Sequence, residues 1–274
     1  MAQRDAAGSY LAHMQIDITT AQYYYCTSNW RHPNFISDYN RLYYFLGEGA
    51  YLRIGDRELY PAAGHLVVLP AATKLTVLAL DDRTFYKYYC HFTATVGEMN
   101  LFKLLTMNDA VMAHDLDAVA ARFAELTQHA NGSGITSALR AKLALQELLC
   151  YFIEHNDTVR LNWKASAAME KTKLVLAYLD EHLADDIRLD DLAKLLHFHP
   201  GYFIPYFKSL FGLTPMQYVK RKRMETAKQL LIESGLSVSE IAERVGSSLY
   251  PFSKSFKSYT GYSPSDYRSH AGIR

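Results

Sequence analysis

The chain is poor in cysteine and has no long apolar run. Cys26, Cys90 and Cys150 are its three cysteines in 274 residues, and their odd number and wide spacing argue against a disulfide framework. No segment reaches the roughly 20 apolar residues that a membrane-spanning helix needs, and the first residues lack the basic-then-apolar pattern of a secretion signal. We therefore expect a cytoplasmic protein without a membrane partner, long enough for two domains that each bury a core.

Sequence patterns of catalysis and cofactor binding are missing as well. The chain has no glycine-rich phosphate loop, no nucleophile elbow and no group of histidines and carboxylates at metal-ligand spacing. The acidic pairs Asp185-Asp186 and Asp190-Asp191 flank expected helix starts, where carboxylates complement the helix dipole. We predict no catalytic residues, no cofactor and no metal, so the chain is not expected to be an enzyme.

One pattern occurs twice near the C-terminal end of the sequence. Its members recur at an offset of 49 residues in the pairs Ala193/Ala242, Phe203/Phe252, Phe207/Phe256, Lys208/Lys257, Gly212/Gly261, Thr214/Ser263, Pro215/Pro264 and Tyr218/Tyr267. A fixed offset over so many apolar, glycine and proline positions indicates one small structural unit built twice.

Each copy is typical of a short helix, a turn and a second helix that ends at a glycine. In the second copy, Ser237 and Glu240 have the spacing of a capping box, and Gly246-Ser247-Ser248 interrupts the helical pattern. Between the copies, Pro215 to about Ile232 predicts one longer helix. Two helices joined by a tight turn form a helix-turn-helix, and a stiff spacer helix would hold two such units for successive major grooves of DNA.

The distribution of charge agrees with DNA binding. From residue 199 onward the chain has eleven lysines and arginines against five aspartates and glutamates, an excess of six, whereas the formal net charge of the whole chain is +1. Local positive charge of this kind attracts phosphate. Taken alone, the basic run Lys220–Arg223 fits a solvated helix face equally well; beside paired helix-turn-helix units, phosphate contact is the better interpretation.

The stretch from about Glu170 to Arg268 resembles the DNA-binding domain of AraC/XylS-type transcription regulators. The motifs that carry the resemblance are Leu192-Ala193, Tyr202-Phe203, Phe207-Lys208, Gly212-Leu213-Thr214-Pro215, Arg223-Met224-Glu225-Thr226-Ala227, Leu230-Leu231, Ser239-Glu240-Ile241-Ala242, Phe256-Lys257, Gly261-Tyr262-Ser263-Pro264 and Tyr267-Arg268. Two features depart from the family pattern. The second turn looks one residue shorter than usual and lacks an aromatic residue after Gly246, and Pro205 should kink the first reading helix or remove a hydrogen bond from it.

The resemblance implies which side chains meet DNA. The base-edge candidates are Gly201, Ile204, Pro205, Tyr250, Ser253 and Lys254, and the phosphate candidates are Lys208, Arg221, Arg223 and Lys257. Lys254 is the strongest of them, because lysine can donate to O6 and N7 of guanine, whereas Ile204 suits a thymine methyl group. The two phenylalanines in each second helix are four residues apart and are interpreted as core.

The first ninety or so residues have a different pattern, with short β-forming runs separated by turns. This spacing is typical of a sandwich or barrel. The order Gly47-Glu48-Gly49, Ile54-Gly55-Asp56-Arg57, Pro61 to His65 and Leu69-Pro70 resembles the double-stranded β-helix (cupin) domain of many AraC-type regulators. Lys74 stands about where a ligand histidine would follow, and the histidines are scattered, so we reject a metal-dependent oxygenase.

A barrel mouth is a natural small-molecule site, and this part of the chain is dense in aromatic residues. Lys87, Tyr89 and His91 share one strand face by alternation, and the resemblance implies that this face points into the pocket. With Trp30 and Arg41 they form the predicted effector set. Aromatic rings with a few polar tips suit a sugar or a related metabolite, although for any single tyrosine a place in the core is the alternative.

The remaining segments complete the predicted order of domains. Between the two halves the pattern turns helical, and the resemblance assigns these helices to dimerisation, with packing against the barrel as the alternative. The predicted parts are a cupin-like, all-β effector-binding domain (1–97), a helical dimerisation segment (98–156), a linker (157–169) and an all-α DNA-binding domain with two helix-turn-helix units (170–274).

These patterns predict a sequence-specific transcription regulator under the control of a small-molecule effector. The expected partners are double-stranded promoter or operator DNA, a sugar-like effector and a second copy of the chain, with RNA polymerase as a further candidate. Two other hypotheses stay open at this point. One is a cupin-type enzyme or sugar-binding protein with an accessory helical domain, and the other is an architectural DNA-binding protein that responds to no ligand. Activation and repression are not distinguished.

Overall fold

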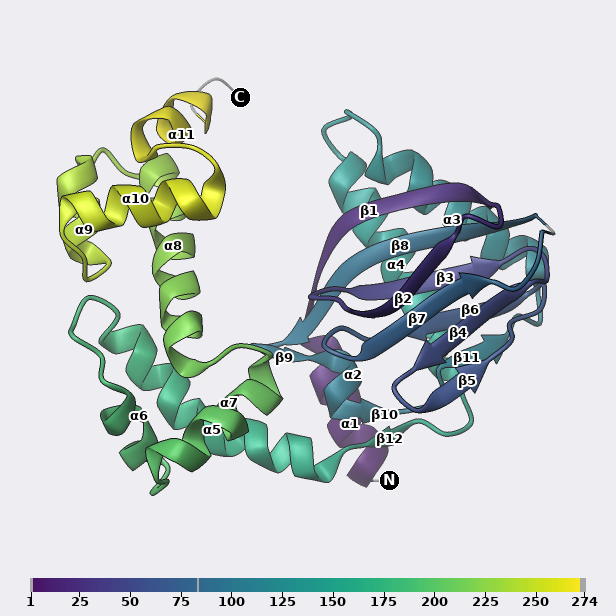
Figure 1. Ribbon diagram of the computed structural model, residues 1–274, viewed down its shortest axis with the longest axis horizontal. Coiled ribbons are helices and arrows are strands. Elements are labelled where there is room, and N and C mark those ends of the chain that lie inside the picture. The colour runs from purple at the N-terminus through teal and green to yellow at the C-terminus, as the bar shows by residue number, and fades with distance from the viewer. Residues whose placement is uncertain (1, 83, 272–274) are drawn as a thin grey trace. The chain divides into compact units, whose positions relative to one another are not determined.

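A computed structural model of the protein describes residues 2–82 and 84–271 (Figure 1). The chain folds into two compact units, Met1–Ser166 and Ala167–Arg274. The first unit carries the β-sheets, and all regular elements in the described part of the second unit are helices. Within the described part of the chain, no helix is both long and apolar enough to span a bilayer.

The described part of the first unit contains two larger antiparallel sheets and a separate pair of two short strands. One has the order β1 (Met14–Cys26), β8 (Phe85–Val96), β3 (Asn40–Phe45), β6 (His65–Leu69) and β11 (Ala110–Met112), with β9 (Met99–Asn100) paired to β8. The other has the order β2 (Arg31–Ile36), β7 (Lys74–Ala79), β4 (Ala50–Ile54) and β5 (Arg57–Leu59). The prediction of a β-rich first domain is confirmed. Closure into one barrel is not shown, because the strands pair as two separate sheets.

The two sheets bury a common core. Alternation along β4 places Ala50, Leu52 and Ile54 inside, as expected for a strand with one face toward a core. They belong to one cluster with Phe45 of the first sheet and Val77 of the second. Complete burial of a side chain of this size contributes about 1.5–3 kcal/mol, so residues from both sheets stabilise their face-to-face packing.

Four helices complete the first unit. They are α1 (Ala2–Ala12), α2 (Leu101–Leu104), α3 (Leu116–Ala130) and α4 (Ser137–Glu154). Helix α3 covers the outer face of the first sheet: its Phe123 stacks on Tyr44 and on Tyr88, with ring centroids 5.7 and 5.6 Å apart. The inner face of the helical segment thus packs against the β-domain. This packing was the alternative interpretation of the segment. Other residues of α4 are exposed.

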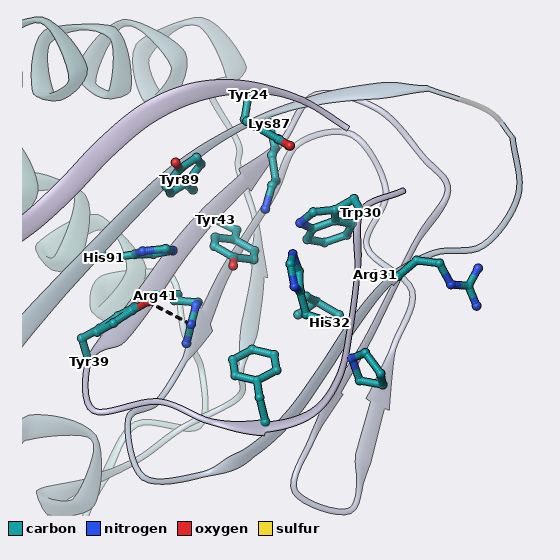
Figure 2. A pocket seen from close by; sticks show the side chains of 13 residues that line it. Tyr24, Trp30, Arg31, His32, Tyr39, Arg41, Tyr43, Lys87, Tyr89 and His91 are labelled. Atoms are coloured by element: carbon teal, nitrogen blue, oxygen red, sulfur yellow. Dashed lines mark hydrogen bonds between the residues drawn. The ribbon is translucent and has the colours of Figure 1, made fainter. Parts of the chain in front are cut away.

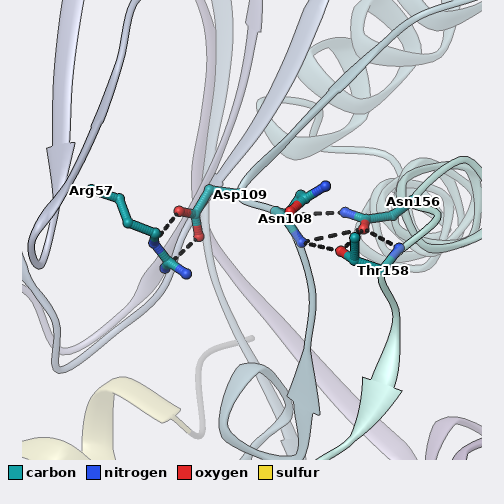
Figure 3. A network of polar contacts seen from close by, with 5 residues as sticks. All are labelled: Arg57, Asn108, Asp109, Asn156 and Thr158. Atoms are coloured by element: carbon teal, nitrogen blue, oxygen red, sulfur yellow. Dashed lines mark hydrogen bonds and ion pairs between the residues drawn. The ribbon is translucent and has the colours of Figure 1, made fainter.

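Residues 98–156 are not helical throughout. Strand β11 pairs with β6, and β10 (Leu105–Thr106) pairs with β12 (Arg160–Leu161). Polar contacts fix the loop before β11 (Figure 3): the Asn108 backbone N–H donates to Thr158 Oγ1 at 2.8 Å, and the Asn156 side-chain amide donates to the Asn108 carbonyl at 2.8 Å. Strand pairing and hydrogen bonds between residues so distant in sequence leave no local pattern. Strands β10, β11 and β12 were therefore not predicted.

The carboxylate next to this network is also anchored. Asp109 forms an ion pair with Arg57 of β5, with an Nε–Oδ2 distance of 2.8 Å (Figure 3). Burial raises the pKa of Asp109 to about 6, against the opposing effect of the Arg57 guanidinium. The pair joins the second sheet to the chain that enters β11 of the first sheet.

The second unit consists of short helices around a long one. In order they are α5 (Trp163–Glu181), which begins within the first unit, then α6 (Leu189–Leu195), α7 (Pro200–Phe211), α8 (Pro215–Glu233), α9 (Val238–Arg244), α10 (Leu249–Thr260) and α11 (Pro264–Ala271). The expected spacer helix is α8, which begins at the predicted proline and ends one residue beyond the predicted end. The segment 157–169, expected to be a linker, contains β12 and the start of α5.

Two separate cores lie along α8. The first half of α8 contributes Tyr218 and Val219 to a core with α5, α6 and α7. The second half contributes Met224 and Leu231 to a core with α9 and α10. The sequence repeat is therefore a repeat of structure, and α8 is the element that the two cores share.

Candidate functional site

Each repeat forms two helices joined by a turn of four residues. The turns are residues 196–199 between α6 and α7, and 245–248 between α9 and α10. The second turn is therefore no shorter than the first. In each turn one residue takes the left-handed conformation, His197 with φ 56° and Gly246 with φ 68°. Glycine adopts this backbone at little cost, and the equal turns place α7 and α10 in equivalent positions within their repeats.

The two turns differ in the side chain that follows the left-handed residue. The Phe198 ring packs against Tyr202 and Tyr206, with centroids 4.9 and 5.0 Å apart, and the Lys171 ammonium lies 4.3 Å from the Phe198 centroid. The equivalent Ser247 donates its hydroxyl to the Ser248 carbonyl at 3.2 Å. The aromatic contact of the first unit is therefore missing from the second.

The phenylalanines of α7 and α10 are core residues, as predicted. Phe203, Phe207, Phe252 and Phe256 are fully buried. In each helix the two ring centroids are 5.6 Å apart. Their burial fixes which face of each helix points outward, and this outer face carries the predicted DNA contacts.

The predicted base-edge residues lie on the outer faces of α7 and α10. The exposed ones are Gly201, Pro205, Tyr250 and Lys254, and the half-buried ones are Ile204 and Ser253. Helix α7 continues through Pro205 to Phe211, and Pro251 is the third residue of α10. A proline in the first turn costs no intrahelical hydrogen bond, whereas Pro205 removes the N–H that would bond the Gly201 carbonyl.

Three of the four predicted phosphate residues have side chains at the surface. Lys208 and Lys257 are exposed in the last turns of α7 and α10. Arg221 is half-buried, with its guanidinium carbon 5.4 Å from the Tyr218 ring centroid. Cations at these places can approach a phosphate backbone beside either helix.

Arg223 is bound inside the second unit instead. Its Nε donates to the Leu183 carbonyl at 3.0 Å, its Nη2 to the Asp185 carbonyl at 2.6 Å and its Nη1 to the Gly246 carbonyl at 3.3 Å. A guanidinium that donates to three backbone carbonyls, two of these hydrogen bonds being part-buried, is held in place by them. We therefore interpret Arg223 as a residue that positions the second turn, in place of the predicted phosphate contact.

A cavity of about 610 Å³ opens in the β-domain of the first unit (Figure 2). It is lined by Tyr24, Trp30, Arg31, His32, Pro33, Phe35, Tyr39, Arg41, Tyr43, Val77, Lys87, Tyr89 and His91. All five residues of the predicted effector set are among them. Antiparallel pairing brings several together: Arg41 of β3 is opposite His91 of β8, and Tyr43 is opposite Tyr89.

Lys87 lies at the closed end of this pocket. Its ammonium is 3.6 Å from the Tyr43 ring centroid, 4.1 Å from that of Trp30 and 5.4 Å from that of Tyr89. Only 2% of the residue is exposed. Burial is the main cause that lowers the pKa of Lys87 to about 7, with Cys26 acting in the opposite direction and repulsion from Arg41 in the same direction. The aromatic faces stabilise the cation in part.

Arg41 and His91 form the polar wall of the pocket. The Arg41 guanidinium carbon is 4.7 Å from the Phe35 ring centroid and 4.6 Å from that of Tyr39, and Nη2 donates to the Tyr39 hydroxyl at 3.3 Å. The His91 ring is stacked on Tyr39 with centroids 4.7 Å apart. Burial, then repulsion from Arg41 and Lys87, lowers the pKa of His91 to about 3, so this histidine is neutral at pH 7.

Histidines and carboxylates are not arranged for a metal in the described part of the chain. No group of three or more His, Cys, Asp or Glu side chains there could hold an ion. The Nδ1 atom of His65 instead accepts a hydrogen bond from the Ala62 N–H at 3.0 Å. His65 is therefore a hydrogen-bonded histidine.

Comparison with known proteins agrees with both parts of this structure. A helix-turn-helix domain family matches residues 192–270. The raffinose operon transcriptional regulatory protein RafR of Pediococcus pentosaceus is 27% identical over 235 residues, which are 83% of either chain. The Msm operon regulatory protein of Streptococcus mutans is 27% identical over 236 residues, which are 84% of either chain.

The chain is thus similar to AraC/XylS-type DNA-binding transcription regulators, with the helix-turn-helix match at residues 192–270. The two relatives that span most of this chain are both named as regulatory proteins of operons. Among solved structures, the DNA-binding domain of AdpA in complex with a target DNA is 33% identical. It covers 36% of this chain and 91% of the AdpA chain, with a TM-score of 0.36.

Eight of the thirteen described lining residues lie outside the predicted effector set, and four of these eight are tyrosines or phenylalanines. Tyr24, Phe35, Tyr39 and Tyr43 line the cavity beside the predicted residues. Alternation alone places Tyr43 on the same face of β3 as Arg41, and that signal could have identified it. The positions of the other three residues in the cavity wall depend on which strands pair. The sequence pattern does not show this pairing.

Proposed function

We propose that this protein regulates transcription in response to a sugar or a related metabolite bound in the pocket of its first unit. The observation that carries the proposal is the cavity itself. Its volume of about 610 Å³ lies in the range of small-molecule sites, and rings of Trp30, Tyr43 and Tyr89 face it beside buried Arg41 and Lys87. Two relatives that span most of the chain carry the names of the raffinose and msm operons.

For the DNA side, we propose that α7 and α10 each enter a major groove. Tyr250 is 80% exposed and Lys254 is exposed on the outer face of α10, where a lysine can donate to guanine. On α7, Pro205 and Gly201 offer no hydrogen-bonding side chain. The first helix-turn-helix is therefore proposed to bind mainly through DNA shape, phosphates and the Ile204 methyl groups.

We propose that a second copy of the chain covers the outer face of α4. Leu139 is 70% exposed and Leu143 is 53% exposed. With the exposed Cys150, they lie at positions i, i+4 and i+11 of one helix, which share a face. Helix α4 already buries its opposite side against α3 and the sheet. The exposed apolar stripe is therefore suited to a self-complementary contact with a second copy. Dimerisation would give each operator two DNA-binding units.

Ligand control requires an energetic preference. A molecule in the pocket can change the arrangement of DNA-binding units only if it binds one arrangement more tightly than another. The proposed mechanism is that effector binding changes which pair of DNA half-sites the dimer can reach. Activation and repression are both compatible with such a change.

Selection of DNA from a random pool, at one stated salt concentration and with or without a panel of sugars, tests this function. We expect an enriched sequence with two blocks about one helical turn apart for each protomer, and a footprint that changes with at least one sugar. A footprint insensitive to every ligand would indicate an architectural DNA-binding protein. Failure to enrich any sequence over bulk competitor would contradict sequence-specific binding.

A further inference from the structure

The effector pocket contains several basic side chains and no carboxylate. Among its thirteen described lining residues, Arg31, Arg41 and Lys87 are cationic side chains and none is an aspartate or glutamate. The described residues also provide no ion pair to Arg41 or Lys87. Protein interiors rarely keep a charge without an opposite charge nearby. The described lining residues therefore leave the positive charge of the cavity wall without a compensating negative charge.

Arg41 is the first group that points to a ligand. It is 8% exposed and lines the cavity (Figure 2). One terminal nitrogen donates to Tyr39, while the other, Nη1, is buried and has no hydrogen-bond partner among the described residues. A buried donor without an acceptor is unfavourable. A planar guanidinium with a free terminal N–H, stacked between Phe35 and Tyr39, is ready to bind a carboxylate or phosphate oxygen.

Lys87 is the second such group. Its ammonium is surrounded by aromatic faces, the nearest centroids being those of Tyr43 and Trp30 at 3.6 and 4.1 Å. These rings lower the cost of the charge but supply no formal negative charge. Repulsion from Arg41 is one cause of the lowered pKa of Lys87, so the two side chains repel one another when both are charged. An anion in the cavity would relieve this repulsion and attract both groups.

We infer that the effector is an acidic sugar, a hydroxylated carbon skeleton with one carboxylate or phosphate group, and that Arg41 and Lys87 bind its anionic group. This rests on the proposed function, since it specifies the ligand of the same pocket. A neutral sugar of equal size would leave two buried cations uncompensated in the complex. The aromatic rings of Trp30, Tyr43 and Tyr89 contact the carbon skeleton, and neutral His91 offers its ring nitrogens to hydroxyl groups.

Titration of the full-length protein with sugars that differ only in charge tests this inference. The probes are D-galactose, D-galacturonate and D-galactose 6-phosphate, and the same three forms of D-glucose. Tryptophan fluorescence reports binding, since Trp30 lines the cavity, and calorimetry provides an independent readout. We expect at least one acidic form to bind tenfold or more tightly than its neutral parent. The carboxylate and phosphate arms show which anion the site prefers.

Substitutions then assign the charge recognition to particular side chains. We expect Lys87→Met and Arg41→Gln each to weaken binding of the acidic form tenfold or more, with little effect on any binding of the neutral parent. Lys74→Gln is the matched control, because Lys74 is an exposed cation of β7 outside the lining of the cavity. It should change affinity by less than about twofold. Two independent variants keep the test informative if one of them folds poorly.

The outcomes separate this inference from the function on which it rests. Equal or tighter binding of a neutral sugar, together with a change in the DNA footprint, would overturn the acidic-ligand inference and leave the proposed function intact. An acidic sugar whose affinity survives both Lys87→Met and Arg41→Gln would also overturn it. If no member of either class altered fluorescence, heat or footprint, both proposals would fail.

Discussion

The Arg223 guanidinium donates to the carbonyl oxygen of Gly246 at 3.3 Å. Arg223 lies on the spacer helix α8, and Gly246 is the left-handed residue in the turn of the second helix-turn-helix. The same guanidinium bonds the carbonyls of Leu183 and Asp185. One side chain thus connects the chain before α6, the spacer helix and the second turn, which are the parts that must be rigid for two reading helices to keep their separation.

Arg223→Met should therefore act on stability first. Hydrogen bonds to a charged group contribute about 1.5–3 kcal/mol each, and bonds that share one group do not add fully, so we expect a loss of roughly 2–4 kcal/mol. Urea unfolding followed by helical circular dichroism measures this change, with the exposed Arg244→Met as the control. Normal stability combined with a flatter salt dependence of DNA binding would instead restore Arg223 to the phosphate contacts.

Gly246→Ala should disturb the same region sterically. A Cβ at this position would lie 2.6 Å from the Ala184 carbonyl oxygen, and the backbone has φ +68°. A left-handed backbone costs a residue with a side chain roughly 1–2 kcal/mol, and the clash with backbone adds to it. We expect at least 2 kcal/mol of destabilisation in urea unfolding. Gly235→Ala is the matched control, since its Cβ meets nothing within 4 Å and no positive φ is involved; equal effects at both sites would refute the explanation.

Two lysines of α10 should affect DNA binding in different ways. Lys254→Ala should cost roughly 1–3 kcal/mol on the best site and relax preference at one or two base positions. Lys257→Ala should weaken all sequences alike and reduce the slope of log affinity against log salt by about one. Both residues are exposed on one helix, so each variant is the control for the other. Selection from a random pool and salt titrations distinguish them, and a uniform loss for Lys254→Ala would remove it from the base contacts.

The apolar stripe of α4 makes a prediction about assembly. Leu143→Glu should shift the protein from dimer to monomer in sedimentation equilibrium, because a carboxylate would be buried against an apolar partner. Ala138→Glu is the matched control, since Ala138 is exposed near the start of α4 and lies off the stripe. An unchanged dimer in both variants would place the interface elsewhere. A monomeric wild-type protein at micromolar concentration would contradict the proposed dimer.

Local patterns determined which parts of the fold could be predicted. The spacer helix was placed within one residue because Thr214 caps it and Pro215 begins it. The capping box of Ser237 and Glu240 likewise forms as expected, with an Ser237 N–H to Glu240 Oε2 distance of 2.7 Å. Caps, prolines and glycines act within a few residues, so their consequences are readable along the chain.

The rest depended on pairing between distant segments. Alternation grouped Lys87, Tyr89 and His91, but their positions opposite Phe45, Tyr43 and Arg41 require the register of β3 against β8. The three hydrogen bonds of Arg223 were not predicted, because backbone carbonyls are present everywhere and no sequence pattern marks the three that it binds. Strand β11 is three residues long, too short for periodicity to reveal it.

Lys87 should make both stability and ligand binding depend on pH. Its folded pKa of about 7 lies below its ordinary value of 10.5, so the unfolded state binds more protons between these values. The free energy of unfolding of the empty protein should therefore rise with pH from about 7 toward 10, by up to about 1.4 kcal/mol per pH unit from this group. Thermal unfolding measures this rise, and Lys87→Met should remove it.

Binding of an acidic sugar should have the opposite dependence. The ammonium that attracts the anion is lost as pH rises through the pKa, so affinity should fall between pH 6 and 8. Of the groups that face Lys87, Arg41 stays charged, burial raises the pKa of Cys26 to about 11, and His91 is already neutral. Burial also raises the pKa values of Tyr43 and Tyr89. Calorimetric titrations at several pH values measure this effect, with Lys87→Met as the control variant. A wild-type affinity that does not change between pH 6 and 8 would show that the charge of Lys87 does not bind the ligand.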